Sequence, residues 1–256
     1  MRYRKGYIAL SDERDVPVLL LIRNARAITF DQICALAMLE GGESSRRSVY
    51  WRLSRLEGCE LIRRMTFDRF FSQPIFAITP MGLQFLEFRG HSLLSLPSTT
   101  KSIVRKSQIL HSVELAGIRV ALAQKGLLQS WKWELEIVSR NLVCETGKLK
   151  DFDALAEIGV DGNTKRVAIE FERTLKGSGR YEELRRIFSA DQTVDRVLYL
   201  TPNPEILYIL AVEMRDVGKR IGFALSATFR SALLEASILT NSPANDVLSF
   251  REFLFQ

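Results

Sequence analysis

The stretch from Lys150 to Tyr181, KDFDALAEIGVDGNTKRVAIEFERTLKGSGRY, decides the fold of this chain. Asp153 begins one short apolar run, and a second run, RVAIEF, ends at Phe171 with an acidic residue on either side of it. The Asp-Gly-Asn sequence at 161–163 between the two runs is typical of the turn in a β-hairpin. The pattern therefore predicts two antiparallel strands that bring Asp153 and Glu170 to the same edge of a sheet.

A third carboxylate belongs to this predicted edge. Glu170 and Glu172 are two residues apart, so they share one face of the strand while Phe171 points into the core. Clustered carboxylates repel one another unless a cation lies among them, and oxygen ligands without His or Cys favour Mg²⁺ or Mn²⁺. We therefore expect Mg²⁺ or Mn²⁺ as the cofactor and no small-molecule cofactor.

These residues resemble the PD-(D/E)XK nuclease superfamily, in which an acid on one strand and a Glu-x-Lys on the next bind the metal that drives phosphodiester cleavage. Asp153 matches the first acid and Glu170 the second, whereas Glu172 stands where the family has Lys. Lys176 follows one turn later and is the candidate to supply that charge. The stretch is also similar to replication-relaxation proteins and MobC-type plasmid mobilisation relaxases, which place a winged helix before a nuclease-like domain.

The composition fits a DNA-binding protein. The 256 residues are 46% apolar, which is ample for a core, and the net charge of +6 favours a polyanionic partner. Three scattered cysteines fit neither a disulfide framework nor a zinc site. The longest apolar run, 18–22, is too short to span a membrane, and no signal peptide is apparent. We therefore expect a cytoplasmic protein without a membrane partner.

The N-terminal part has the element order of a winged helix-turn-helix. Three helices begin near Asp12, Thr29 and Ser44 or Ser45, a hairpin is predicted over 61–79, and Thr79-Pro80 begins another helix. The run FAITPMG is similar to the Y-x-L-T-x-x-G closure of many winged-helix regulators. Such a third helix enters the major groove, and the hairpin reaches the flanking backbone. The DNA-binding candidates are Arg46, Arg47, Tyr50, Arg52, Arg63, Arg64, Arg69 and, for a phosphate in the second domain, Arg180.

Three parts follow from these patterns: a winged helix over 1–90, a Ser/Thr/Pro-containing linker over 91–107, and a nuclease-like domain over 108–256. The last part predicts the order α-β-β-β-α-β-α-β, an α/β fold with a mixed central sheet. Runs at 130–136 and 137–144 are typical of strands, and 245–255 predicts a terminal helix. Glu114, on a helix predicted over 108–124, is a further metal-ligand candidate.

The predicted function is sequence-specific binding of double-stranded DNA with metal-dependent cleavage of a phosphodiester. Asp153 and Glu170 would hold the metal, with Glu172 or Glu114 completing its shell, and Lys176 would orient the attacking water. The resemblance implies site-specific nicking at a transfer or replication origin.

Two alternatives stay open beside this nuclease. One is a non-catalytic transcription or replication regulator, whose degenerate nuclease fold would serve as a homodimer interface; Glu172 in place of Lys favours it. No heptad pattern predicts the dimer. The other is covalent attack by Tyr181, which is disfavoured because the chain has only 2 histidines for the cluster that such relaxases use.

Overall fold

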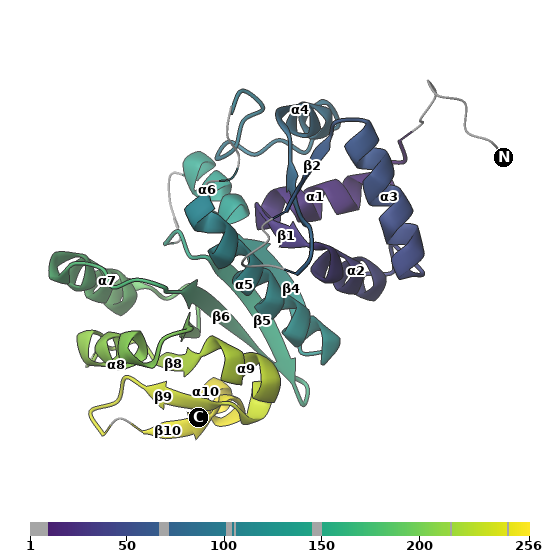
Figure 1. The fold of residues 1–256 in the computed structure, drawn as a ribbon. Helices are drawn as coiled ribbons and strands as arrows, with labels where there is room; N and C mark the ends of the chain where they lie inside the picture. The colour runs from purple at the N-terminus through teal and green to yellow at the C-terminus, as the bar shows by residue number, and fades with distance from the viewer. Residues whose placement is uncertain are drawn as a thin grey trace. The chain divides into compact units, whose positions relative to one another are not determined.

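The computed structural model describes residues 10–66, 72–100, 104, 106–144, 150–215, 217–244 and 246–256. The protein is mixed α/β, with two separate sheets (Figure 1). The chain divides into two compact units, Met1–Ala116 and Gly117–Gln256, and helix α5 (Lys106–Gln124) runs across the boundary in sequence. Within the described ranges, every helix falls short of the length and apolar character needed to cross a membrane.

The first unit combines a small antiparallel sheet with helices in the predicted order. Its strands lie in the order β1-β3-β2, all antiparallel. Side-chain caps from Thr29, Ser45 and Thr79 begin α2, α3 and α4 at predicted positions. Along the chain the elements are α1 (Asp15–Ala25), β1 (Ile28–Thr29), α2 (Phe30–Leu39), α3 (Arg46–Gly58), β2 (Ile62–Met65), β3 (Ile75–Ile78) and α4 (Pro80–Phe88).

The second unit is built on a seven-stranded sheet in the order β10-β9-β8-β7-β6-β5-β4. Strands β6, β7 and β8 are parallel, and every other neighbouring pair is antiparallel. The predicted hairpin is β5–β6, and its turn places Asp161 and Gly162 at φ 50° and 80°. The strands are β4 (Leu128–Trp133), β5 (Ala154–Val160), β6 (Asn163–Phe171), β7 (Arg196–Thr201), β8 (Ile221–Leu225), β9 (Ser237–Thr240) and β10 (Val247–Ser249).

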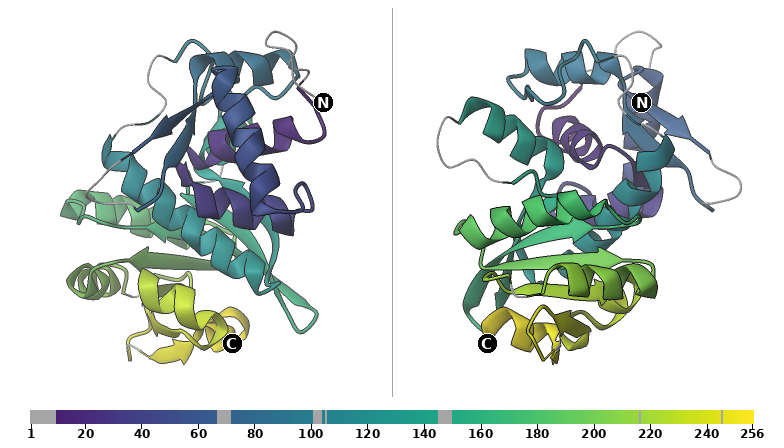
Figure 2. Two further views of the ribbon diagram at one scale, coloured as in Figure 1. Left: turned by 45° about the vertical axis from the view of Figure 1, so that its right-hand side comes forward. Right: turned by 90° about the vertical axis from the view of Figure 1, so that its left-hand side faces the viewer.

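Helices cover both faces of this sheet (Figure 2). On one face Phe188 of α7 and Leu210 of α8 pack with Tyr199 and Phe223 in one apolar core. On the other face α10 lies so close that a Cβ on Gly222 would meet the Phe253 ring at 2.9 Å. The helices are α6 (Glu134–Val143), α7 (Ser178–Ala190), α8 (Pro204–Glu213), α9 (Ser226–Ala232) and α10 (Phe250–Phe255), with a 3₁₀ turn at Leu233–Glu235.

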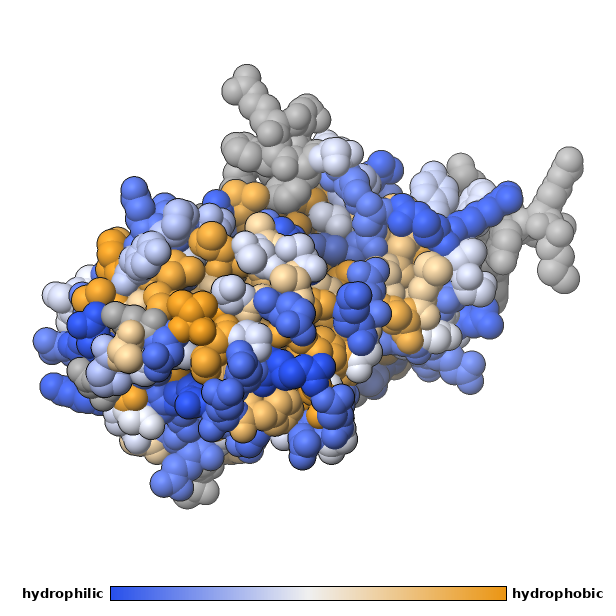
Figure 3. Space-filling view, turned by 90° about the horizontal axis from the view of Figure 1, so that it is seen from below, coloured by the Kyte–Doolittle hydropathy of each residue, from blue (hydrophilic) through white to orange (hydrophobic). Residues whose placement is uncertain are grey.

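The outer side of α8 leaves apolar side chains at the surface. Tyr208 is 66% exposed and Val212 is 60% exposed, and they lie one helical turn apart. Figure 3 shows apolar residues reaching the surface between hydrophilic ones on the face seen from below.

Two predicted elements are wrong. The run 137–144, predicted as a strand, belongs to helix α6, because the Trp133 N–H donates to the Glu136 carboxylate at 3.0 Å and this contact caps a helix. The predicted terminal helix begins only at Phe250, because residues 247–249 pair with β9 instead. Strand β9 and helix α9 were not predicted, so the predicted element order of this unit is incomplete.

Candidate active site

Asp153 and Glu170 meet at one end of the β5–β6 hairpin. Ala154 pairs with Ile169, and continuing this antiparallel register by one residue sets Asp153 opposite Glu170. Residues directly opposite each other project from the same face of a sheet. Asp153 is positioned further by the Phe171 N–H, which donates to its Oδ2 at 2.7 Å. The hairpin therefore brings the two carboxylates together, as its sequence predicts.

Glu170 is buried against a lysine. Its carboxylate is 7% exposed and contacts the ammonium of Lys150. Burial raises the pKa of Glu170; the Lys150 charge opposes that rise, and the Asp153 charge adds to it. The Lys150 side chain is itself only 9% exposed, and its Nζ lies 4.7 Å from the centre of the Phe152 ring. Lys150 thus supplies a buried positive charge at the acidic pair.

Glu172 and Lys176 form a second pair beside the first. Burial lowers the pKa of Lys176, while the charge of Glu170 opposes this shift, so Lys176 lies within electrostatic reach of the acidic pair. The Lys176 backbone N–H donates to the Tyr181 hydroxyl at 3.0 Å, which ties this loop to the first turn of α7. Arg180, on the same turn, contacts Glu183 and remains half exposed.

Tyr199 is a member of the site that the sequence patterns do not identify. It pairs with Glu170 across the parallel β6–β7 register, so both side chains project from one face. Its ring is fully buried, and its hydroxyl has no hydrogen-bond partner among the described residues. Burial raises its pKa, and the charge of Glu170 adds to this rise. The sequence signal for Tyr199 was its hydroxyl group, the polar side-chain atom inside the apolar run VLYL.

Asp153 and Glu170 could supply part of the ligand shell of a divalent cation. Mg²⁺ is commonly bound by one or two carboxylates, with water and substrate phosphate completing its shell. Asp153 and Glu170 supply that number, and the unpartnered Tyr199 hydroxyl is a neighbour for a bound water. Nowhere in the described part of the chain do three His, Cys, Asp or Glu side chains gather closely enough to hold a metal.

The expected third ligand is therefore missing from the described residues. Glu172 is held by Lys176, and Glu114 lies on the part of α5 that belongs to the first unit. Among the described residues neither is grouped with Asp153 and Glu170, and the roles of Glu172 and Glu114 as metal ligands stay predictions.

A basic hollow lies on the same sheet face, farther along β5. It has a volume of about 270 Å³ and includes Lys132, Arg140, Arg166 and Glu157 in its lining. Glu157 is four residues from Asp153 in the direction away from the acidic pair, which corresponds to roughly 13 Å along the strand. The hollow thus carries three cations and one carboxylate, and that carboxylate already accepts a hydrogen bond from Ser130.

In the first unit, helix α3 exposes a basic and aromatic surface. Arg46 and Arg47 lie in its first turn, and Tyr50 and Trp51 are 51% and 61% exposed. Arg46 contacts Asp31 and lies 5.1 Å from the Phe30 ring centre, whereas Arg47 makes no such contact with the described residues. Trp51 was not predicted as part of this surface, although it adjoins Tyr50 in the sequence.

The remaining predicted DNA contacts divide into three groups. Arg63 and Arg64 are exposed on β2, as predicted. Arg69 lies outside the described residues. Arg52 is buried, 8% exposed, and pairs with Asp15 and Glu43, which corrects its prediction as an exposed DNA-binding residue.

Comparison with known proteins adds little to this geometry. No family model matches the chain, and no curated protein matches it. The chain is similar to the structure of restriction endonuclease FokI at a TM-score of 0.31 and 10% identity, and to the structure of FokI bound to DNA at 0.26 and 9%. In both cases 88% of this chain covers 45% of the other, so it spans less than half of that protein. At these TM-scores the likeness carries no argument about function.

Proposed function

We propose that this protein binds double-stranded DNA and cleaves a phosphodiester bond with a divalent metal held by Asp153 and Glu170. The observation that supports it is the pairing of these two carboxylates on one sheet face beside the buried Lys150. A structural ion pair needs only two partners, whereas a third ionisable group in the same buried corner adds a desolvation cost, and such costly arrangements cluster at functional sites.

The chain's own residues have distinct parts in this reaction. A bound Mg²⁺ or Mn²⁺ would supply Lewis-acid chemistry, by polarising the phosphoryl oxygen and activating a water. Asp153, fixed by the Phe171 N–H, orients its ligand oxygen. Lys150 stabilises negative charge at Glu170 before the metal binds, and Lys176 is the more accessible ammonium for the phosphate. The Tyr199 hydroxyl, which has no partner among the described residues, is available to donate a hydrogen bond to an oxygen within the site and remains protonated.

The first unit, in this proposal, is a winged helix-turn-helix that delivers the site to DNA. Helix α3 presents Arg47, Tyr50 and Trp51 to the major groove, and Arg63 and Arg64 of β2 contact the flanking backbone. Because Arg46 is engaged by Asp31 and Arg47 is not, we expect Arg47→Gln to weaken binding to the cognate duplex more than Arg46→Gln. Site-specific nicking at a mobilisation or replication origin, in the cytoplasm, is the setting that the family resemblance suggests.

The test is cleavage of a supercoiled plasmid in Mg²⁺ or Mn²⁺. We expect nicked product from the wild-type protein and at least about a hundredfold less from Asp153→Asn or Glu170→Gln, since each removes a metal ligand. Glu182→Gln is the matched control, because Glu182 is exposed on α7 and should leave the rate unchanged. Nicking that survives both substitutions would refute the assignment of the site.

A second candidate function, a non-catalytic DNA-binding regulator, is favoured by one observation. Lys150 and Lys176 already neutralise Glu170 and Glu172 without a metal. This candidate predicts specific DNA binding with no nicking in either metal, together with a homodimer in sedimentation. Binding without cleavage, unchanged by Asp153→Asn, would select it.

A further inference from the structure

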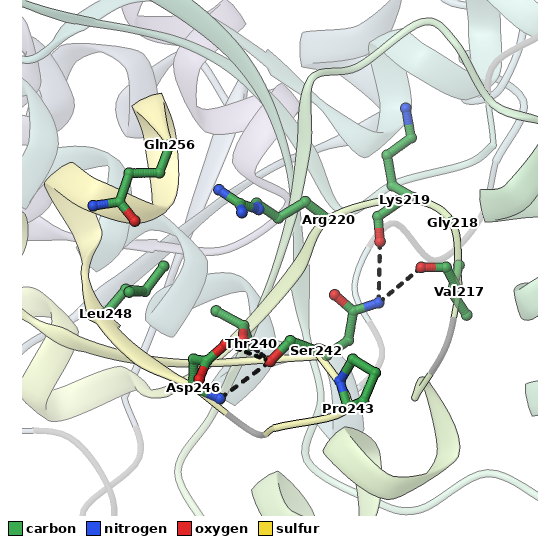
Figure 4. A pocket seen from close by; sticks show the side chains of 11 residues that line it. Val217, Gly218, Lys219, Arg220, Thr240, Ser242, Pro243, Asp246, Leu248 and Gln256 are labelled. Carbon is green, nitrogen blue, oxygen red and sulfur yellow. Dashed lines mark hydrogen bonds between the residues drawn. The ribbon is translucent and has the colours of Figure 1, made fainter.

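Another cavity lies at the opposite end of the sheet from Asp153 and Glu170, where β8 begins and β9 ends. Its volume is about 480 Å³, within the range of small-molecule sites (Figure 4). The side chains that matter for its chemistry are polar or charged: Lys219, Arg220, Thr240, Ser242, Asp246 and Gln256. The length of the strands separates this cavity from the candidate active site.

The wall of the cavity is held by Asn241. Its side-chain N–H groups donate to the carbonyl oxygens of Met214, Val217 and Lys219 at 3.1 to 3.3 Å. Its Oδ1 accepts from the Ile221 N–H at 2.9 Å. All of these contacts are internal, so Asn241 holds the backbone of Met214, Val217, Lys219 and Ile221 without a ligand.

Arg220 is the polar group in this wall that lacks a partner. Its Nη1 is buried and has no hydrogen-bond acceptor within the described part of the chain. In Figure 4 its side chain extends toward Gln256, whereas Lys219 points away from it. Lys219 is engaged elsewhere, because its Nζ donates to the Val194 carbonyl oxygen at 2.7 Å. A buried guanidinium nitrogen with an unused N–H calls for an acceptor, even though the Arg220 side chain as a whole is only partly buried.

A second guanidinium group increases the local positive charge. Arg196 donates to the carbonyl oxygens of Phe253 and Asp195, at 2.8 and 3.0 Å. Burial lowers the pKa of Arg196, and the charge of Arg220 lowers it further. Asp246 is the side-chain carboxylate in the cavity lining, and it already accepts from the Ser242 hydroxyl at 2.8 Å. The positive charge at Arg220 is therefore best matched by an anion from outside the chain.

We infer that this cavity binds a phosphate monoester, with Arg220 as its main ligand. A guanidinium group matches two phosphate oxygens at once, and the nearby charge of Arg196, which does not line the cavity, adds to the attraction for a dianion. The cavity is larger than a phosphate group, so it has room for the moiety that carries it. That moiety is either a small phosphorylated molecule or the 5′-phosphate end of a nucleic-acid strand.

Calorimetric titration of the full chain in phosphate-free buffer tests this site. The probes are AMP and a 5′-phosphorylated tetranucleotide, each paired with its dephosphorylated counterpart, adenosine or the 5′-hydroxyl tetranucleotide. We expect binding that requires the phosphate, and Arg220→Gln should weaken it by at least about tenfold, the effect of losing a charge-assisted hydrogen bond. Arg186→Gln, an equal charge change on the exposed side of α7, should leave the affinity unchanged.

The two probes distinguish the sources. Phosphate-dependent binding of AMP alone identifies a small phosphorylated ligand, and binding of the tetranucleotide alone identifies a strand end. Arg220→Lys keeps the charge but loses the planar guanidinium group, so it must also weaken binding. This variant keeps the test decisive if Arg220→Gln does not fold. Equal affinity for phosphorylated and dephosphorylated probes, or affinity unaffected by both Arg220 substitutions, would overturn the inference. None of these readouts depends on DNA cleavage.

Discussion

At the scale of single residues, the contact between Lys150 and Glu170 sets the charge of the candidate active site. Both side chains are about nine-tenths buried, so each loses most of its hydration, and the opposite charge of its partner offsets that loss. The pair therefore behaves as a unit: removing one partner leaves a buried charge, whereas removing both leaves an apolar corner.

Replacement of Lys150 by Met should lower the free energy of unfolding by about 3 kcal/mol, because Glu170 would be left buried without its cation. The double variant Lys150→Met/Glu170→Leu should recover most of that loss. Lys165→Met is the control, since its contact with Asp195 spans 3.7 Å near the surface and should contribute less than about 1 kcal/mol. Urea denaturation measures all three, and equal stability of Lys150→Met and wild type would show that the pair is solvated.

The same residues show how far the sequence could predict the site. The Asp-Gly turn fixes the hairpin register, so the pairing of Asp153 with Glu170 followed from local sequence. Lys150 begins the quoted stretch, but its contact with Glu170 depends on how the chain before β5 packs, which no local pattern shows. Tyr199 arrives from a separate strand, and the order of strands in a sheet is not encoded in any short run.

At the scale of elements, a buried ionic network ties α1 to α3. Asp15 at the start of α1 is fully buried and contacts Arg52, at 2.5 Å, and Arg55. Burial by itself would raise the pKa of Asp15, but hydrogen bonds from Ser11, Arg55 and Arg52 outweigh it, and the pKa is lowered. A lowered carboxylate pKa stabilises the fold above its ordinary value near pH 4, and this stabilisation is lost as the pH falls through the lowered value.

Replacement of Asp15 by Asn should therefore cost about 3 kcal/mol of unfolding free energy at pH 7, because two arginines lose their buried counter-charge. The difference from wild type should shrink below about pH 4, where the wild-type carboxylate also becomes protonated. Urea midpoints followed by circular dichroism between pH 7 and pH 3 measure this. A difference that stayed constant across that range would mean that Asp15 acts by shape and not by charge.

The closing helix of the first unit depends on one glycine. A Cβ at Gly82 would lie 2.1 Å from the Leu61 carbonyl oxygen, so α4 can approach this backbone only without a side chain there. We expect Gly82→Ala to lower the melting temperature clearly, with a loss of about 1–3 kcal/mol from displaced packing. Gly58→Ala is the matched control, since nothing lies within 4 Å of its Cβ, and thermal unfolding of the two variants should differ.

Some helices and strands could be predicted from the sequence and others could not, and the reasons are physical. Helices α2, α3 and α4 carry their own caps, so their starts are local properties of the sequence. Helix α6 was mistaken for a strand because Ile137 and Val138 are β-branched and its cap is a glutamate three residues into the helix. Strands β9 and β10 are only 4 and 3 residues long, too short to show a pattern, and they form because β8 offers an edge.

At the scale of the whole molecule, each unit carries a cationic surface of its own. The first has α3 and β2, whose exposed arginines were predicted from sequence. The second has the hollow lined by Lys132, Arg140 and Arg166. This hollow was not predicted from the sequence, because its residues come from β4, α6 and β6 and converge only in the folded sheet. A positive net charge alone does not distinguish such a surface from scattered cations.

If the hollow carries the DNA strand toward Asp153 and Glu170, its cations neutralise phosphates. Removing one phosphate-binding cation should reduce the slope of log affinity against log salt concentration by about 0.9 for duplex DNA. The variant Lys132→Gln/Arg140→Gln/Arg166→Gln should thus reduce the slope by about 2 to 3 on a fixed duplex, measured by fluorescence anisotropy in EDTA so that cleavage does not intervene. A control with three exposed cations outside the hollow's lining, Lys125→Gln/Arg186→Gln/Arg215→Gln, carries the same change in net charge. An equal reduction of slope in the two triple variants would mean that overall charge, and not this hollow, determines DNA affinity. A reduction confined to the variant of Lys132, Arg140 and Arg166 would place the DNA strand along β5.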